Sequence, residues 1–238
     1  PDRGCQRRPV DAITAPARTN GQQGLDYHTD WLVLFGMNNS QHESRTRLLD
    51  AALDVFRAKG YSATRVEDVC AAAGLTKGSF FHHFRTKDDL AISAADRWSV
   101  VTGAIFQQAD YTHLADPVDR LLGYIDFRKQ LLRGSLAEYT CLLGTLVQEV
   151  FDTHPPIRDA CQASLDAHVA MLMPDIEAAR AAHIPQARWS AQSLALHMQA
   201  VIQGAFVIAK AGHGATAAGD SIDHLKRYVA GLFGRPVQ

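Results

Sequence analysis

"CAAAGLTKGSFFHHF", residues Cys70–Phe84, is the stretch that decides the fold of this chain. Gly74 is a typical helix end, and Thr76 can cap a second helix that starts directly after it. Phe80 and Phe84 are four residues apart, which places both rings on one face of that helix and predicts that they are buried. The stretch therefore predicts two short helices joined by a tight turn that contains a glycine, the sequence form of a helix-turn-helix.

Helical periodicity continues on both sides of this stretch, with apolar residues at three- and four-residue spacing from Glu43 onward. Thr64 with Glu67, and Thr86 with Asp89, have the spacing of capping boxes. No segment alternates as a strand does, so the predicted fold class is all-α. The expected helices span about 43–59, 65–73, 77–84, 86–108, 117–133, 136–151, 156–183 with a kink at Pro174, 187–211 and 220–233.

Composition limits the class of protein. The 238 residues carry a formal net charge of −1, and 47% of them are hydrophobic, which suffices for a core but indicates no partner by charge. We expect no secretory signal and no membrane span, and therefore a cytoplasmic protein. The cysteines are Cys5, Cys70, Cys141 and Cys161. Their wide spacing, without a CxxC pair or an HExxH motif, predicts reduced thiols, no metal site and no cofactor.

Residues 1–39 differ from the rest of the chain, because they are rich in Pro, Gly, Gln, Asn and Arg and have no helical period. This composition predicts a disordered N-terminal tail. Met37 lies just before the helical pattern begins, and whether residues 1–36 are native stays open. The helix-turn-helix is then expected at residues 40–88, and a larger helical domain at 89–238.

Basic charge is concentrated around the second helix of the motif. Residues 41–97 have nine Lys or Arg and eight Asp or Glu, but residues 76–87 have three basic residues and no acidic one. In a helix-turn-helix the start of this helix enters the DNA major groove, where its free N–H groups favour phosphate. Gly78 is a poor helix former, and its lack of a side chain would let the backbone come close to DNA. The pattern predicts a local DNA-binding surface.

Ser44–Leu90, "SRTRLLDAALDVFRAKGYSATRVEDVCAAAGLTKGSFFHHFRTKDDL", resembles the DNA-binding region of the TetR family of bacterial transcriptional regulators. The matching features include the Arg-x-x-Leu-Leu opening, the Gly-Tyr turn, the Ala-Gly-x-Thr-Lys-Gly-Ser turn and the aromatic-His-His-Phe after it. The resemblance implies phosphate contacts from Arg45, Thr64, Lys77, His82 and Lys87, backbone approach at Gly78, and base contacts from Arg65, Thr76, Ser79 and His83. For the two histidines, the alternative is a pair of surface residues without a role.

Phe81 departs from the family pattern, which usually has a tyrosine at this place. A phosphate-binding hydroxyl is then absent, and the ring can offer only apolar contact, for example to a thymine methyl group.

The resemblance also implies that the helices after about residue 90 form a ligand-binding and dimerisation domain. The last two, about 187–211 and 220–233, would form a four-helix bundle with a second copy, although a plain core helix has the same apolar pattern as residues 191–210. The aromatic and polar residues that are candidates for lining a ligand pocket are Trp98, Phe106, Tyr124, Phe127, Tyr139, His168, Trp189 and His197. Each of them is also explained by core packing.

Glu138–Ala160 resembles a narrower subgroup, in which a small residue or cysteine precedes Leu-Leu-Gly and some members respond to electrophiles or oxidants through that cysteine. Here the residue is Cys141. Lys210, on the penultimate expected helix, is placed where it can approach Cys141, and a nearby ammonium raises the thiolate fraction of a cysteine. The alternative is that Cys141 is a small buried hydrophobic residue.

Together these features predict a homodimeric, sequence-specific DNA-binding transcriptional regulator, most simply a repressor that a small-molecule inducer releases from a palindromic operator. The alternative is a redox- or electrophile-sensing repressor switched by modification of Cys141. No nucleophile–base pair and no metal motif points to an enzyme. An activator or an architectural DNA-binding protein stays open, and the sequence names neither the operator nor the inducer.

Overall fold

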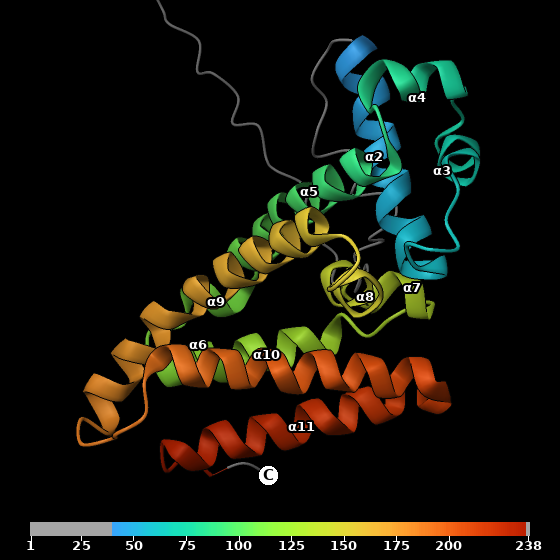
Figure 1. Cartoon of the computed structure of the whole chain (residues 1–238). Coiled ribbons are helices and arrows are strands. Elements are labelled where there is room, and N and C mark those ends of the chain that lie inside the picture. Colours follow the sequence, from blue (N-terminus) through green and yellow to red (C-terminus); the bar gives the residue numbers. More distant parts are fainter. Residues whose placement is uncertain (1–39, 237–238) are drawn as a thin grey trace, which may run out of the picture. The chain divides into compact units, whose positions relative to one another are not determined.

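The computed structural model describes residues 40–236, and every regular element within that range is a helix (Figure 1). The predicted all-α fold class is therefore confirmed for the described part of the chain. The tail predicted at residues 1–39, with Cys5, lies outside it. The helices are α2 (Ser40–Lys59), α3 (Val66–Ala73), α4 (Lys77–His83), α5 (Lys87–Gln107), η1 (Asp110–His113), α6 (Pro117–Gln130), α7 (Leu136–Tyr139), α8 (Leu142–Val150), α9 (Pro155–His183), α10 (Ala191–Ile208), η2 (Ala209–His213) and α11 (Gly214–Leu232).

The helices α2, α3 and α4 form the predicted helix-turn-helix unit. α2 packs against α3 and α4, and also against α5, which follows them in the chain. Its apolar stripe has helical spacing and faces inward, because burial of apolar side chains stabilises the folded state. The buried apolar side chains of the unit include Leu48, Leu49, Ala52, Leu53, Phe56, Val69, Cys70, Phe80 and Phe84.

α5 links this unit to the helices that follow, and it lies along α9 (Figure 1). Its buried side contains Ala91, Ala94 and Ala95, whose small side chains let the two helices approach closely. The Ser164 hydroxyl of α9 donates a hydrogen bond to the Ala95 carbonyl at 3.2 Å. The contact between the two helices is therefore polar as well as apolar.

The C-terminal helices α6, α9, α10 and α11 pack against one another, and α10 and α11 form an antiparallel hairpin (Figure 1). Asp116 caps α6 by accepting hydrogen bonds from the N–H groups of Val118 at 2.7 Å and Asp119 at 3.3 Å. Its Oδ2 atom also lies 2.6 Å from the Arg235 guanidinium and 3.0 Å from His183 Nε2. One carboxylate thus joins the start of α6 to the ends of α9 and of the described chain.

The prediction of one continuous helix at 136–151 is wrong, because the chain is extended at Thr140 and Cys141, between α7 and α8. Threonine is a poor residue for a helix interior, and here the Thr140 hydroxyl donates to the Leu136 carbonyl at 2.6 Å. The break allows both Tyr139 and Leu142 to be buried.

The boundaries expected for the last two helices are also wrong. α10 begins at Ala191 rather than near residue 187, and after Ile208 the chain passes through the π-helical segment η2 into α11. Gly212 and Gly214 have φ values of 111° and 66°, which glycine adopts without strain. The two glycines therefore let α11 begin at Gly214, several residues before the expected start at 220.

The capping box predicted at Thr64 and Glu67 forms one residue later, at Arg65 and Asp68. α3 starts at Val66, and the Arg65 N–H donates to Asp68 Oδ2 at 2.9 Å. By contrast, Thr86 caps α5 as predicted, since its hydroxyl accepts from Asp89 N–H at 3.0 Å.

α9 runs unbroken through Pro174. No membrane span was expected from the sequence, but within the described residues one continuous stretch, Ala191–Leu232, is long and apolar enough by composition to cross a membrane. This stretch comprises α10, η2 and α11, and 44% of its most apolar window is buried inside the protein.

Candidate functional site

The turn between α3 and α4 has a defined backbone geometry. Gly74 ends α3 in the left-handed region, with φ 61° and ψ 38°. The Leu75 N–H donates to the Cys70 carbonyl at 2.9 Å, as in a Schellman motif. The Thr76 hydroxyl then accepts from Ser79 N–H at 3.2 Å, so α4 begins where the sequence predicted.

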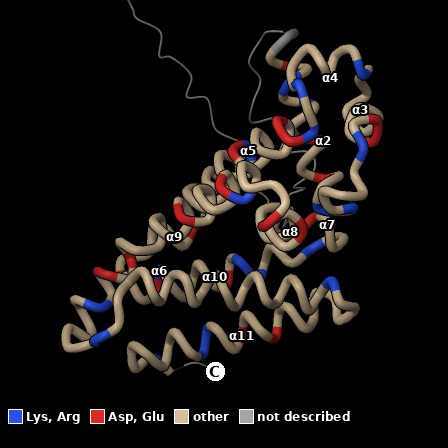
Figure 2. The backbone as a smooth tube through the Cα atoms, in the orientation of Figure 1, with Lys and Arg blue, Asp and Glu red and all other residues tan. Residues whose placement is uncertain are grey.

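α4 has one buried and one exposed face. Phe80 and Phe84 are buried, with their ring centroids 5.6 Å apart, as the sequence predicted. Phe81 points outward with 58% of its surface exposed, and Lys77 and His82 are exposed as well. The outer face therefore combines an apolar ring with basic and polar groups, and α4 contains no acidic residue, whereas α3 does (Figure 2).

Lys77 and Gly78 begin this exposed face. The Lys77 ammonium forms an ion pair with the Glu67 carboxylate of α3, which holds the pKa of that carboxyl below its usual value. Sequence reasoning missed this pair because it assigned Glu67 to a capping box. A methyl group at Gly78 would lie 3.6 Å from Thr76 Oγ1, an ordinary contact, so packing within the chain does not require a glycine there. Gly78 is itself exposed, so the backbone of α4 is uncovered at this position.

Two predicted DNA contacts have partners inside the unit. The Thr64 hydroxyl is buried and donates to the Gly60 carbonyl at 2.5 Å. His83 Nε2 lies 2.6 Å from Ser44 Oγ, and desolvation lowers the pKa of the imidazole. Both side chains therefore stabilise the unit in the free protein, and their contacts with DNA stay predictions.

Lys87 and Arg45 also have internal contacts. The Lys87 ammonium donates to the carbonyls of Tyr61 at 2.9 Å and Thr64 at 3.0 Å, and desolvation lowers its pKa. The Arg45 guanidinium lies 5.2 Å from the centroid of the Phe84 ring. The other predicted contacts at the surface are Arg65, Thr76 and, half-buried, Ser79.

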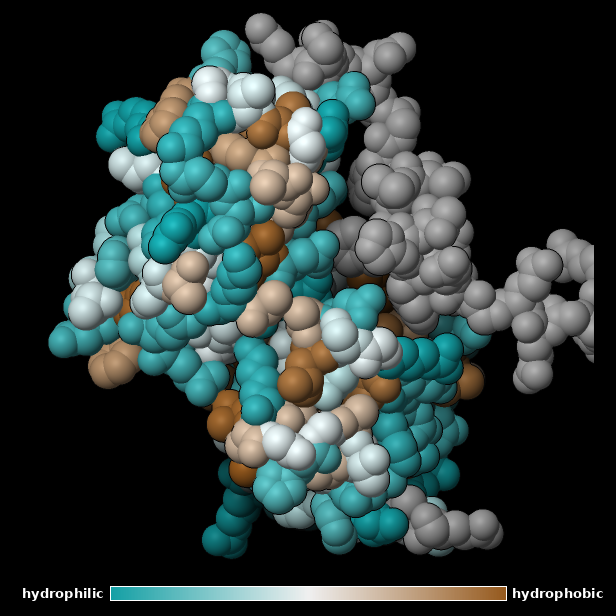
Figure 3. All heavy atoms as spheres, turned by 90° about the vertical axis from the view of Figure 1, so that its right-hand side faces the viewer, coloured by the Kyte–Doolittle hydropathy of each residue, from teal (hydrophilic) through white to brown (hydrophobic). Residues whose placement is uncertain are grey.

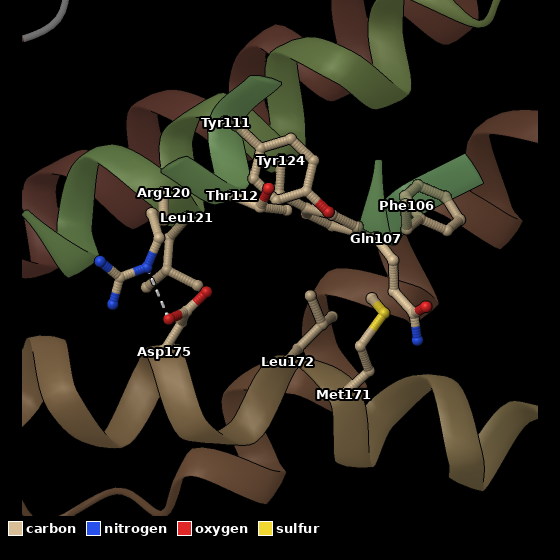
Figure 4. A pocket seen from close by; sticks show the side chains of 10 residues that line it. All are labelled: Phe106, Gln107, Tyr111, Thr112, Arg120, Leu121, Tyr124, Met171, Leu172 and Asp175. Atoms are coloured by element: carbon tan, nitrogen blue, oxygen red, sulfur yellow. Dashed lines mark hydrogen bonds and ion pairs between the residues drawn. The ribbon is translucent and has the colours of Figure 1, made fainter. Parts of the chain in front are cut away.

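The helical domain has a cavity of about 120 Å³ between α5, η1, α6 and α9 (Figure 4). Figure 4 shows the Arg120–Asp175 ion pair at one end of it and Gln107 and Met171 at the other, with Arg120 Nε 2.7 Å from Asp175 Oδ1. The lining residues are Phe106, Gln107, Tyr111, Thr112, Arg120, Leu121, Tyr124, Met171, Leu172 and Asp175. Phe106 and Tyr124 were predicted to line a pocket, whereas Arg120 and Asp175 carried no sequence signal because 55 residues separate them.

A chain of polar side chains continues from the cavity into the core. Gln199 Nε2 donates to the Tyr124 hydroxyl at 2.9 Å, and this hydroxyl lies 2.9 Å from His168 Nε2. Burial lowers the pKa of His168 to about 3, so its imidazole is neutral, and in the tautomer with its proton on Nδ1 the Nε2 atom accepts a hydrogen bond from the Tyr124 hydroxyl. His168 thus belongs to the same cluster as Tyr124, although it does not line the cavity.

The remaining ligand candidates are not brought to the cavity wall. Phe127 packs on Phe106 with centroids 5.8 Å apart, behind the lining. His197 is exposed and lies against Tyr228 on α11, with centroids 4.9 Å apart. The other three candidates have partners away from the cavity. The Arg57 guanidinium lies over the Trp98 ring, and the rings of Tyr139 and Trp189 pack against Phe206 and Phe233, respectively.

Cys141 is the residue before the first turn of α8 and is buried. Its carbonyl accepts from the N–H of Thr145 at 3.2 Å and from the Thr145 hydroxyl at 2.9 Å. The Lys210 ammonium donates to the same hydroxyl at 2.5 Å. Desolvation lowers the pKa of Lys210, and the nearby Glu149 carboxylate acts in the opposite direction. Thr145 thus connects Lys210 to the Cys141 carbonyl, because its hydroxyl accepts from the ammonium and donates to that carbonyl. Cys161 is buried too, and burial raises the pKa of its thiol to about 12.

Among the described side chains no group of three His, Cys, Asp or Glu is arranged to hold a metal ion.

The predicted α10–α11 surface does carry exposed apolar side chains, and Figure 3 shows apolar residues at the surface of the lower half of the molecule. The exposed apolar residues of the hairpin include Leu196, Val207, Ile208 and Tyr228.

Comparison with known proteins gives matches to both helical regions. Residues 48–94 match the model of the bacterial regulatory proteins of the tetR family, and residues 117–225 match a tetracycline-repressor-like C-terminal domain. Among curated proteins, the transcriptional regulator AcuR of Cereibacter sphaeroides is 29% identical over 103 residues, 43% of this chain and 47% of AcuR. The repressor DhaR of a Mycobacterium species is 43% identical over 121 residues, 51% of this chain and 57% of DhaR. The chain therefore spans only about half the length of these two relatives.

Solved structures extend the similarity over most of the chain. A TetR transcriptional regulator from Chloroflexus aurantiacus superimposes with a TM-score of 0.70 and 26% identity, covering 80% of this chain and 96% of that one. The reduced form of Escherichia coli NemR, at 22% identity and a TM-score of 0.68, shares the fold over 78% of this chain. The matched regions contain most of the helix-turn-helix and the cavity-lining helices α6 and α9. The chain belongs to the TetR family of bacterial transcriptional regulators, which are not enzymes.

Proposed function

We propose that this protein is a homodimeric, sequence-specific DNA-binding repressor of the cytoplasm, released from a palindromic operator by a small molecule. TetR-family transcriptional regulators are DNA-binding repressors. The observation that carries the proposal is the outer face of α4, where Lys77, Gly78, Phe81 and His82 are exposed while Phe80 fixes the helix from beneath. This face suits a helix that lies in a major groove, with phosphate near its first turn and base edges further along.

The α10–α11 hairpin supports the dimer. Leu196, Val207 and Ile208 on α10 are 47%, 41% and 48% exposed, and Tyr228 on α11 is 50% exposed. Gly204, also exposed, has no neighbouring atom within 4 Å of where a methyl group would be, so it would permit close approach of another helix. Two copies would then hold two α4 helices at the spacing of adjacent half-sites.

The cavity beside Tyr124 is the site we propose for the inducer. Its volume of about 120 Å³ is below the roughly 300–1,000 Å³ usual for drug-sized ligands, so it suits a small compound as it stands. It lies between α5, which continues from α4, and α9. A compound that fits better when these helices are displaced would favour the state that does not bind the operator.

Selection of duplexes from a random DNA pool tests the DNA-binding proposal. The wild-type protein is expected to enrich a palindrome with two half-sites about one helical turn apart, and Lys77→Ala to enrich it poorly. The same selection at higher salt should lose affinity for all sequences, because phosphate contacts release counterions. If the wild-type protein enriches no palindrome, the dimeric repressor model is wrong.

A second candidate function is a repressor switched by covalent modification of Cys141, as an electrophile or oxidant sensor. It is favoured by one observation, the hydrogen bond from the Lys210 ammonium to Thr145, which holds a cation close to the start of α8, the helix that Cys141 directly precedes. Treatment with N-ethylmaleimide or hypochlorite should then release the selected duplex, and Cys141→Ser should remain bound. If Cys141→Ser responds as the wild type does, this second function is wrong.

A further inference from the structure

A carboxylate of α8 binds the backbone turn between α2 and α3. Glu149 Oε1 accepts a hydrogen bond from Tyr61 N–H at 3.1 Å, and Oε2 accepts one from Ser62 N–H at 3.0 Å. Hydrogen bonds from N–H groups to an ionised carboxylate are about twice as strong as those between neutral groups. The two bonds join residues 87 and 88 positions apart in the chain, so they fix the DNA-binding unit to the helical domain.

A glycine in the turn leaves the space that this side chain occupies. Gly60, which follows α2, has φ 78°, in the region that glycine adopts readily. A methyl group at this glycine would lie 1.9 Å from Glu149 Oε1, so any other residue would displace the carboxylate. The glycine therefore serves both the turn and the close approach of Glu149.

The first residues of α5 also bind this turn. The Lys87 ammonium donates to the carbonyls of Tyr61 and Thr64, and lies 4.0 Å from the centroid of the Tyr61 ring. The Tyr61 hydroxyl donates to Asp88. Lys87 and Asp88 follow α4 within five residues, so the turn connects Glu149 to the segment that sets the position of α4.

The opposite end of α8 contacts the hairpin that we propose for dimerisation. Thr145 accepts a hydrogen bond from Lys210, and a methyl group at Gly144 would lie 2.3 Å from Gln203 Oε1 of α10. α8 has nine residues, a length of about 13 Å at 1.5 Å per residue, and is regular throughout. A displacement at its start is therefore carried to Glu149 at its end, because a single helix moves as a rigid unit.

We propose that Glu149 is the positioning residue through which the helical domain sets the orientation of the DNA-binding unit. In the operator-binding state Glu149 holds the Tyr61–Ser62 turn, and movement of α8 withdraws it and frees the unit to take the wrong spacing. The inference rests on the proposed function as a DNA-binding repressor.

Glu149→Gln is the variant that tests the proposal, because it keeps the size of the side chain but replaces one acceptor oxygen with an NH₂ donor that faces a backbone N–H. Asp152→Asn is the matched control, since it makes the same charge change three residues further on at an exposed position. With the duplex enriched by the wild-type protein, Glu149→Gln should weaken binding about tenfold. Its binding to a random-sequence duplex should be unchanged, and Asp152→Asn should bind both as the wild type does.

Amide hydrogen exchange measures the coupling between α8 and the DNA-binding unit, which would be absent if Glu149 only stabilised the fold. The operator duplex should slow exchange of residues 142–148 in the wild type, because coupling between two sites is reciprocal, and should not slow it in Glu149→Gln. In the free protein, Lys210→Ala should speed exchange at Tyr61 and Ser62 in the wild-type background but not in the Glu149→Gln background.

The proposal is overturned if Glu149→Gln matches Asp152→Asn in duplex binding. It is also overturned if Lys210→Ala leaves exchange at Tyr61 and Ser62 unchanged. If the wild-type protein enriches no duplex, the proposed function is wrong instead. Hydrogen exchange at Tyr61 and Ser62 in the protein without DNA then decides the role of Glu149.

Discussion

Lys77 and Glu67 form an ion pair across the turn of the helix-turn-helix, so the ammonium nearest the start of α4 is held by a carboxylate in the free protein. Both side chains are more than half exposed, which makes the pair weak and easily exchanged for another partner. A DNA phosphate near the first turn of α4 would compete directly with Glu67 for this ammonium.

Glu67→Gln is therefore expected to tighten binding to DNA of any sequence, by about threefold at low salt, because the variant frees Lys77 and removes a negative charge from the interface. Fluorescence anisotropy with a labelled duplex at several salt concentrations measures the effect. Glu177→Gln, the same charge change at an exposed position of α9, should bind as the wild type does. Weaker binding by Glu67→Gln would show that this carboxylate supports the interface rather than competing with it.

Phe80 and Phe81 are adjacent but differ completely in exposure, at 0% and 58%. Phe80→Ala should lower the free energy of unfolding by about 3–5 kcal/mol, since it opens a cavity beneath α4. Phe81→Ala should change it by less than about 0.5 kcal/mol but weaken binding to the selected duplex. Phe81→Tyr should strengthen that binding, because it supplies the hydroxyl that family members usually have.

Urea unfolding and duplex titration of the three Phe variants separate the two effects. If Phe81→Ala binds the duplex as tightly as the wild type, the exposed ring is not part of the DNA interface.

The burial of His168 predicts a stability that depends on pH. The pKa of His168 is lowered to about 3 in the folded chain, against about 6.5 when unfolded, so between these values the unfolded chain binds more protons. Stability is then complete above pH 7 and falls as the pH drops through 6.5 toward 3. From pH 7.5 to 5.5 the loss from this group is about 1.4 kcal/mol.

His168→Gln keeps an acceptor near Tyr124 and should remove most of that loss, as measured by urea midpoints at the two pH values. His83→Asn is the matched control, because the pKa of His83 is also lowered but its imidazole lies near the surface. A pH dependence that persists in His168→Gln and disappears in His83→Asn would contradict the assignment.

The helix-turn-helix was predictable because local signals fix it. Gly74 and Thr76 mark the turn through their own backbone and capping preferences, and Phe80 and Phe84 reveal the buried face by spacing alone. The capping box at Thr64 failed because several polar residues lie near that helix start. The Thr64 hydroxyl bonds back to the Gly60 carbonyl, and Arg65 with Asp68 forms the cap one residue later.

Long-range contacts were beyond the sequence. The Arg120–Asp175 pair and the Glu149 contacts with Tyr61 and Ser62 join residues between 55 and 88 positions apart, and no local pattern reports such distances. Lys87 was assigned to phosphate because its position matched a family motif, while its hydrogen bonds to two backbone carbonyls depend on a turn that the motif does not describe.

The exposed apolar surface of α10 gives the last prediction. Ile208→Glu places a charge at a side chain that is 48% exposed in the single chain, so folding of the protomer should be nearly unaffected. In a dimer formed through this hairpin the same charge would be buried without a partner, and the dimer should dissociate. Sedimentation velocity should then show a monomer, and binding to the selected palindrome should fall by at least about tenfold because the two half-sites are no longer bound together. Val100→Glu, at a 61% exposed position of α5, is the control and should remain dimeric. A dimer that persists in Ile208→Glu and dissociates in Val100→Glu would move the interface from the hairpin to α5.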